Sequence, residues 1–110
     1  TITITEMKGV QLIEAVGRLD SEGADELAQA CTRALDRGNP KLVLDLSAVD
    51  YISSPGLREV VRYYKLSQSQ GGDLRLSNPN ERVMTVLELA GLDTALGIFP
   101  NRVEAIASYA

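Results

Sequence analysis

Two adjacent hydroxyl residues, Ser53 and Ser54, stand immediately before Pro55 and Gly56, where an apolar run gives way to a helical pattern. Proline suits the first position of a helix, so the sequence predicts Ser54 as the N-cap residue. Free N–H groups at a helix N-terminus favour anions, and a phosphate on Ser54 would be accommodated there. Arg58, four residues further on, would lie on the same face and could pair with that phosphate. The pattern therefore indicates a phosphate-accepting serine, although an unmodified serine cap is its more common use.

The residue types needed for most enzyme mechanisms are absent from the sequence. There is no histidine, so Ser-His-Asp and Cys-His nucleophile activation are excluded. The single cysteine, Cys31, cannot form an internal disulfide or a thiolate zinc site, and its place on an apolar helical face suggests a buried residue. Lys41 and Lys65 are remote in sequence from Ser54 and are poor candidates for its base. We therefore predict a protein that is not an enzyme and uses no cofactor.

Three carboxylates lie in or after predicted strands: Asp20, Asp45 and Asp50. Together they could hold Mg²⁺, but carboxylates at strand ends are common in α/β domains, and we predict no metal site. Asp20 is equally suited to cap the following helix and to contact a partner. Asp45 lies inside a strand pattern and is expected to form structural hydrogen bonds.

Composition narrows the range of partners. The chain has 110 residues, is 45% hydrophobic and 24% charged, and carries a net charge of −4. We expect a single domain over residues 1–110. An acidic chain without a basic run is a poor ligand for nucleic acid or for an anionic membrane. No apolar stretch approaches the roughly 20 residues that span a bilayer, and one unpaired cysteine is typical of the cytosol.

Hydrophobic periodicity predicts nine elements. Alternating Thr and Ile at 1–5 and the run at 10–16 indicate two strands joined by a hairpin at Lys8 and Gly9. Further short strands are predicted at 42–46, 74–76 and 96–99, and helices at 21–37, 55–70, 81–90 and 101–107. The order β-β-α-β-α-β-α-β-α predicts an α/β fold, with a mixed, mostly parallel sheet of four or five strands flanked by about four helices.

The predicted faces and loops place the candidate site. In the second helix the spacing turns Val60 and Tyr64 inward and leaves Tyr63 outside; in the last helix it turns Val103, Ile106 and Ala107 inward. Sites of open α/β sheets lie beyond the carboxyl ends of the strands. Two predicted loops, residues 17–20 and 49–56, follow such ends. We therefore expect the functional surface at these two loops.

Residues 42–57, an apolar strand followed by Asp-Leu-Ser, an aromatic and apolar pair, and then Ser-Ser-Pro-Gly-Leu, resemble the signature of STAS domains. That family includes the bacterial anti-sigma factor antagonists, or anti-anti-sigma factors. Gly-Arg-Leu-Asp at 17–20, Gly-Gly-Asp-Leu-Arg-Leu at 71–76 and Val-Leu-Glu-Leu-Ala-Gly-Leu at 86–92 resemble three further pieces of the family pattern, in the same order.

The resemblance implies a phosphorylation switch in a partner-switching pathway. In that family a GHKL-type serine kinase, which is also the anti-sigma factor, binds the unphosphorylated protein and phosphorylates one serine. A PP2C-type phosphatase reverses the modification. The matching serine here is Ser54, and Asp20 matches a carboxylate close to it. The implied partner-binding surface is made of Asp20, Ser53, Ser54, Pro55, Gly56 and Arg58.

This sequence departs from the family pattern at three positions. Ser53 stands where the family usually has Asp, Pro55 where it has Ser or Thr, and Arg58 where it has a small residue. Ser53 is thus an alternative acceptor, less favoured because Ser54 matches in register. The departures also keep open a second function, that of a non-switching STAS scaffold in a stress-signalling complex or a lipid-transport ATPase.

Overall fold

The predicted order of strands and helices is confirmed by a computed structural model that describes residues 2–110. The elements are β1 (Ile2–Met7), β2 (Val10–Leu19), α1 (Ser21–Asp36), β3 (Lys41–Ile52), α2 (Ser54–Ser69), β4 (Asp73–Ser77), α3 (Glu81–Leu89), β5 (Ile98–Phe99) and α4 (Arg102–Ala107). No helix in this part of the chain is both long enough and apolar enough to cross a membrane.

The strands form one mixed sheet in the spatial order β1-β2-β3-β4-β5. β1 is antiparallel to β2, and every other neighbouring pair is parallel. The hairpin between β1 and β2 turns at Lys8 and Gly9, whose φ angles are 53° and 77°. Positive φ at both central residues is typical of the type I′ turn that joins twisted strands. β3 is paired on both sides and forms the centre of the sheet.

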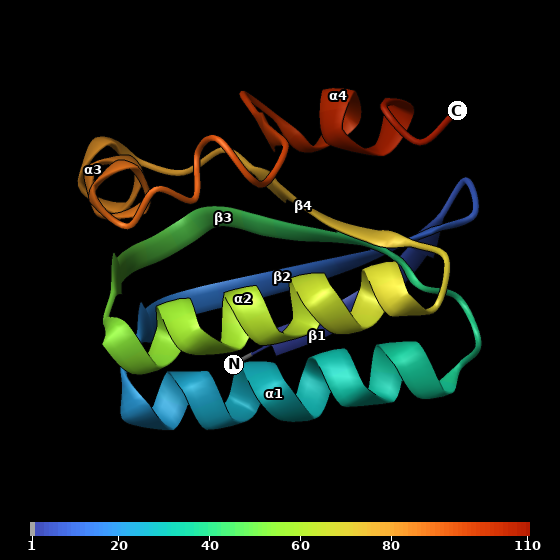
Figure 1. Cartoon of the computed structure of the whole chain (residues 1–110), viewed down its shortest axis with the longest axis horizontal. Helices are drawn as coiled ribbons and strands as arrows, with labels where there is room; N and C mark the ends of the chain where they lie inside the picture. The colour runs from blue at the N-terminus through green and yellow to red at the C-terminus, as the bar shows by residue number, and fades with distance from the viewer. Residues whose placement is uncertain (1) are drawn as a thin grey trace.

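The helices cover both faces of the sheet (Figure 1). α1 and α2 lie side by side on one face, where α3 adds Val83 and Leu87 to the same apolar cluster, and α4 lies on the other face. The main apolar cluster lies beneath α1 and α2. A second, smaller cluster holds α4 against the opposite face; it contains Val10, Leu12, Val43, Ala105 and Ile106. The sheet is therefore packed on both sides, as parallel strands require.

Two strands are longer than predicted. β2 continues to Leu19 and β3 to Ile52, so the two predicted loops begin as strand. Pairing between β2 and β3 persists through two register shifts, between Glu14 and Val16 and between Gly17 and Arg18. These irregularities accommodate polar residues that broke the sequence pattern. β5, in contrast, is shorter than predicted and contains only residues 98–99.

Two predicted helix faces are partly wrong, although Val60 and Ile106 are buried as predicted. Tyr63 is buried, and its hydroxyl lies 2.6 Å from Thr32 Oγ1, because α2 packs against α1 as well as against the sheet. In α4, Val103 is 72% exposed and Ala107 is exposed, whereas Ala105 and Ile106 are buried. Six residues contain fewer than two helical turns, too few for periodicity to define a face. Cys31 is buried as predicted.

Asp45 has the structural role expected for it. Its buried carboxylate accepts hydrogen bonds from the Ser47 and Ser77 hydroxyls, at 3.0 and 3.1 Å. Arg102 Nη2 lies 2.5 Å from Asp45 Oδ2 and 2.9 Å from Glu14 Oε2. One guanidinium thus joins α4 to β2 and β3.

Candidate functional site

The carboxyl ends of β2 and β3 meet at one edge of the sheet. Leu19 pairs with Ile52, and the next residue, Ser53, donates its backbone N–H to the Leu19 carbonyl at 3.0 Å. The Ser53 hydroxyl donates to the same carbonyl at 2.9 Å. These bonds bring Asp20, directly after β2, to the edge where Ser54 begins α2. The two segments singled out in the sequence therefore adjoin.

The N-cap of α2 is Ser53, one residue earlier than predicted. Ser54 is the first helical residue and Pro55 the second. The first-turn N–H groups of a helix have no intrahelical acceptor, so proline is tolerated at the second position as well as the first. Ser53 makes no side-chain capping bond, because its hydroxyl is used on Leu19. Ser54, in contrast, is exposed.

Gly56 supports the site from beneath. It is buried, and a Cβ on it would lie 2.5 Å from the Leu19 carbonyl oxygen and 2.9 Å from Ile52 Cγ1. Gly23 has the same role in α1, where a Cβ would lie 2.1 Å from the Arg18 carbonyl oxygen. In both helices the third residue is a glycine that lets the first turn approach the sheet closely.

Asp20 caps α1 and also reaches the surface. Its Oδ1 accepts the Gly23 N–H at 3.1 Å, and its Oδ2 lies 3.6 Å from Arg18 Nε. The Gly23 hydrogen bond lowers the pKa of Asp20; desolvation opposes this shift, and the Arg18 charge adds a smaller lowering effect. Capping is confirmed for Asp20, and its half-exposed carboxylate stays available to a partner.

Sequence reasoning missed Arg18 and Tyr51 as surface features of this edge. They pair in register on β2 and β3, and the Arg18 guanidinium carbon lies 4.7 Å from the centroid of the Tyr51 ring. Cation–π contacts of this kind hold a guanidinium over an aromatic face. If the two strands had been predicted to reach residues 19 and 52, the alternation of side chains along a strand would have placed Arg18 and Tyr51 on the face opposite Leu19 and Ile52.

An open hollow of about 990 Å³ also lies at this edge and was not predicted. Asp50 and the first turn of α3 line it. The Asn80 amide nitrogen donates to the Val49 carbonyl at 3.1 Å, and the Asn80 side-chain oxygen accepts the Val83 N–H at 2.7 Å. One asparagine therefore caps α3 and ties it to the end of β3.

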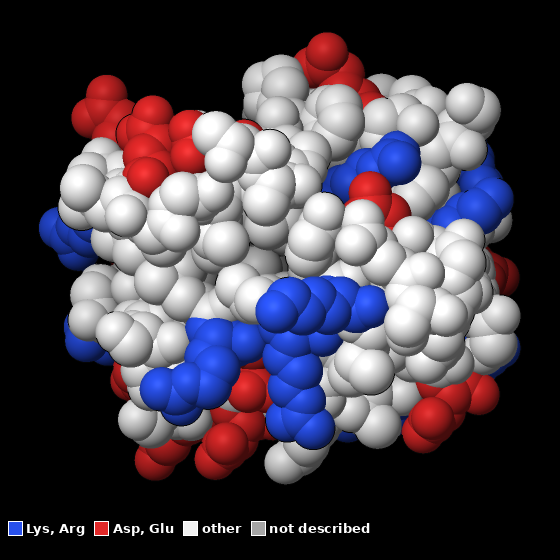
Figure 2. Space-filling view, in the orientation of Figure 1, with Lys and Arg blue, Asp and Glu red and all other residues white. Residues whose placement is uncertain are grey.

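A row of cations follows Ser54 along α2. Arg58, Arg62 and Lys65 are exposed and spaced at helical intervals. Figure 2 shows Lys and Arg side chains gathered over α2, with acidic side chains toward the upper and lower margins of the view. Arg62 is paired with Glu59 at 3.5 Å, whereas Arg58 and Lys65 make no ion pair within residues 2–110. A chain of net charge −4 thus presents a positive stripe beside its candidate serine.

The three carboxylates considered for Mg²⁺ have separate surroundings. Asp45 is buried against Arg102, Asp20 caps α1, and Asp50 lines the open hollow by α3. The part of the chain that the structure describes holds no group of three or more His, Cys, Asp or Glu residues arranged for a metal ion.

Comparison with known proteins assigns the fold to a family. The sequence model of the STAS domain matches residues 1–105, and the chain belongs to the STAS domain family. A Bordetella bronchiseptica protein with the provisional name anti-sigma factor antagonist BtrV is 34% identical over 109 residues, covering 97% of this chain and 91% of the relative. The anti-sigma F factor antagonist of Paenibacillus polymyxa is 27% identical over 106 residues, covering 96% and 91%.

Solved structures agree with this assignment. The crystal structure of an anti-sigma factor antagonist from Mycobacterium paratuberculosis superposes with a TM-score of 0.89 at 26% identity, and covers 98% of this chain and 92% of that one. The resemblance first drawn from short motifs therefore extends over nearly the whole chain.

Proposed function

We propose that this chain is an anti-sigma factor antagonist, a binding protein and not an enzyme, that acts in the cytoplasm under control of phosphorylation at Ser54. Unphosphorylated, it binds a GHKL-type serine kinase that is also an anti-sigma factor, and so releases the sigma factor. A PP2C-type phosphatase restores the binding form. The names of the relatives support the antagonist role.

The observation that carries the proposal is the difference between the two neighbouring serines. The Ser54 side chain is exposed at the first position of α2, whereas the Ser53 hydroxyl is engaged by the Leu19 carbonyl at 2.9 Å. A kinase therefore reaches Ser54 without breaking a bond that joins β2 to α2. This difference favours Ser54 over Ser53 as the acceptor.

A phosphate on Ser54 would change the surface more than the fold. It adds about −1.5 to −2 charges and three acceptor oxygens at neutral pH. The positive end of the α2 dipole and the Arg58 guanidinium one turn later both favour that charge in the free protein. Inside an interface, the same phosphate would be desolvated without a matched partner, and binding would weaken.

The test compares wild type, Ser54→Ala and Ser54→Asp against the GHKL-type kinase encoded in the same genome. Binding is measured by calorimetry, and ATP-dependent mass change by mass spectrometry. Ser53→Ala is the matched control, since it removes the neighbouring hydroxyl. We expect one phosphate on wild type and on Ser53→Ala, and none on Ser54→Ala. Ser54→Asp should bind the kinase weakly. Phosphorylated wild type should regain kinase binding after treatment with a PP2C phosphatase.

One feature favours a second function, that of a non-switching STAS scaffold subunit. Pro55 leaves the first turn of α2 with one N–H donor fewer for a phosphate. If the kinase binds all variants alike and wild type gains no phosphate, the scaffold function replaces the switch. If wild type binds no such kinase, the antagonist role itself is refuted.

A further inference from the structure

A second hollow lies at the end of the sheet opposite Ser54. It has a volume of about 320 Å³ and lies between the β1–β2 turn and α4. Figure 1 shows this turn and the C-terminal end of the chain at the same end of the molecule. We call it the hairpin hollow; the residues that define it are Met7, Lys8, Lys41, Val103, Ile106 and Tyr109.

The walls of the hairpin hollow are largely apolar. Ile106 is buried at its base, while Val103 is 72% and Met7 43% exposed at its sides. Single exposed apolar residues are common on protein surfaces, but these converge on one concave site. The exposed Val103, which the helical pattern had placed in the core, therefore forms part of the apolar wall of this hollow.

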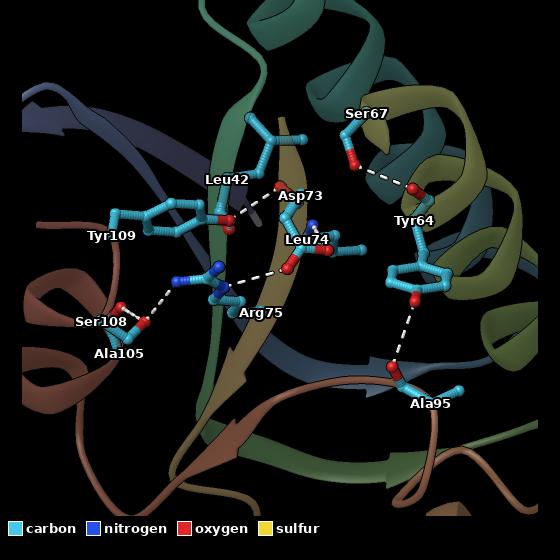
Figure 3. Close-up of polar contacts among 10 residues, drawn as sticks. All are labelled: Leu42, Tyr64, Ser67, Asp73, Leu74, Arg75, Ala95, Ala105, Ser108 and Tyr109. Atoms are coloured by element: carbon cyan, nitrogen blue, oxygen red, sulfur yellow. Dashed lines mark hydrogen bonds and ion pairs between the residues drawn. The ribbon is translucent and has the colours of Figure 1, made fainter. Parts of the chain in front are cut away.

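One wall is held rigidly by the C-terminal residues (Figure 3). The Tyr109 hydroxyl lies 2.7 Å from the Leu42 carbonyl oxygen and 2.8 Å from that of Asp73. The Arg75 guanidinium carbon lies 3.9 Å from the centroid of the Tyr109 ring. Arg75 is itself held by Asp73 at 3.0 Å and by the Ser108 hydroxyl at 2.8 Å. Because this wall is pre-formed, a ligand would not have to order it.

Two unpaired cations stand at the rim. Lys8 lies in the hairpin turn and Lys41 is the first residue of β3; both are exposed, and neither has an ion pair within residues 2–110. No Asp or Glu side chain of the described residues lines the hollow, although Ala110, the last residue of the printed sequence, lies in its wall. The nearby Glu6 accepts a hydrogen bond from the Asn39 amide at 3.3 Å. Apolar walls below two cations match a ligand with an aliphatic tail and an anionic head.

We propose that the hairpin hollow binds a medium-chain aliphatic monocarboxylate. The tail lies against Val103, Ile106 and Met7, and the carboxylate lies between Lys8 and Lys41. A volume of about 320 Å³ is at the lower end of small-molecule sites, which favours a chain of medium length over a long lipid. This site is separate from Ser54 and does not depend on the proposed function.

The first test is calorimetric titration of the whole chain with octanoate, decanoate and decylammonium, each below its micelle concentration. We expect saturable 1:1 binding of decanoate. Affinity should rise about fourfold for each buried methylene, and so about 15-fold from octanoate to decanoate. Decylammonium should bind at least about fivefold more weakly than decanoate, since it places a cation beside two lysines.

Charge reversal supplies the matched control. In Lys8→Glu/Lys41→Glu the preference should invert, with decylammonium bound more tightly than decanoate. Arg58→Glu/Lys65→Glu carries the same charge change at exposed positions of α2 and should bind decanoate like wild type. Val103→Ser, a neutral change at an exposed position, removes apolar contact without altering the charge and should weaken the binding of both ligands. Three results would each overturn the proposal. The first is non-saturable binding, and the second is equal affinity of wild type for decanoate and decylammonium. The third is an equal effect of the two charge reversals on decanoate binding.

Discussion

Arg102→Met would remove the only cation that the structure places against the buried Asp45 carboxylate within residues 2–110. The Asp45 side chain is 3% exposed, and without Arg102 it keeps only the Ser47 and Ser77 donors. Removing one partner of a buried ion pair costs about 3–5 kcal/mol. The Arg102 side chain is 40% exposed, so water can enter the vacated position and the lower value, about 3 kcal/mol, applies.

The expected loss of folding stability is large enough to measure by thermal unfolding. A domain of 110 residues has an unfolding entropy of about 0.23 kcal/mol/K, so about 3 kcal/mol lowers Tm by about 13 °C. Thermal unfolding followed by circular dichroism measures this shift directly. Methionine retains much of the aliphatic packing of arginine, which restricts the change mainly to the charge.

A double-mutant cycle separates the charge from the packing. In Arg102→Met/Asp45→Asn the carboxylate is neutral, so most of the lost stability should return. Glu14→Gln should cost much less, because the Glu14 side chain is partly exposed. If Arg102→Met alone melts within about 3 °C of wild type, or if the double variant is no more stable than the single one, the buried-charge argument is refuted.

Three further outcomes follow from the structure. Burial raises the pKa of the Cys31 thiol to about 12, so a thiol reagent at pH 8 should modify it only after unfolding; rapid modification of the native protein would contradict this. The Gly23 N–H lowers the pKa of Asp20 in the folded state. Its contribution to stability is therefore present above the ordinary aspartate pKa of 3.8 and is lost as pH falls through the lower folded value. Asp20→Asn should therefore flatten the fall of the urea midpoint below that pH, and an unchanged slope would refute it. Gly56→Ala should destabilise by about 1–3 kcal/mol in urea unfolding, because the added Cβ meets the Leu19 carbonyl; wild-type stability would show that α2 can shift freely.

The arrangement of the elements was accessible from sequence because each carries a strong local signal. The Thr–Ile alternation predicted β1, and glycines placed after two helices, Gly38 and Gly91, have positive φ angles of 84° and 74° as helix-ending residues do. The apolar run at 42–46 predicted the centre of the sheet. These features depend on neighbours within a few residues, which is the range that periodicity can read.

The details of the site depend on tertiary contacts and were less accessible. Nothing local indicates that the Ser53 hydroxyl would bond to Leu19, 34 residues away, and so leave Ser54 as the first residue of α2. The polar residues Ser47 and Asp50 interrupt an apolar pattern, yet pairing with β2 keeps them in β3. Tyr63 is buried by α1, a neighbour that the periodicity of α2 alone does not reveal.

The central position of β3 has a consequence for how the two ends of the molecule open. Residues 42–45 of β3 pair with both β2 and β4, so their amides belong to the part of the fold that exchanges hydrogen last. The candidate serine and the hairpin hollow adjoin opposite ends of this strand: the serine begins the first turn of α2, and the hollow lies beside the β1–β2 turn and the six-residue α4. Local opening at either end of the molecule can therefore occur while the amides at the centre of β3 stay protected from hydrogen exchange.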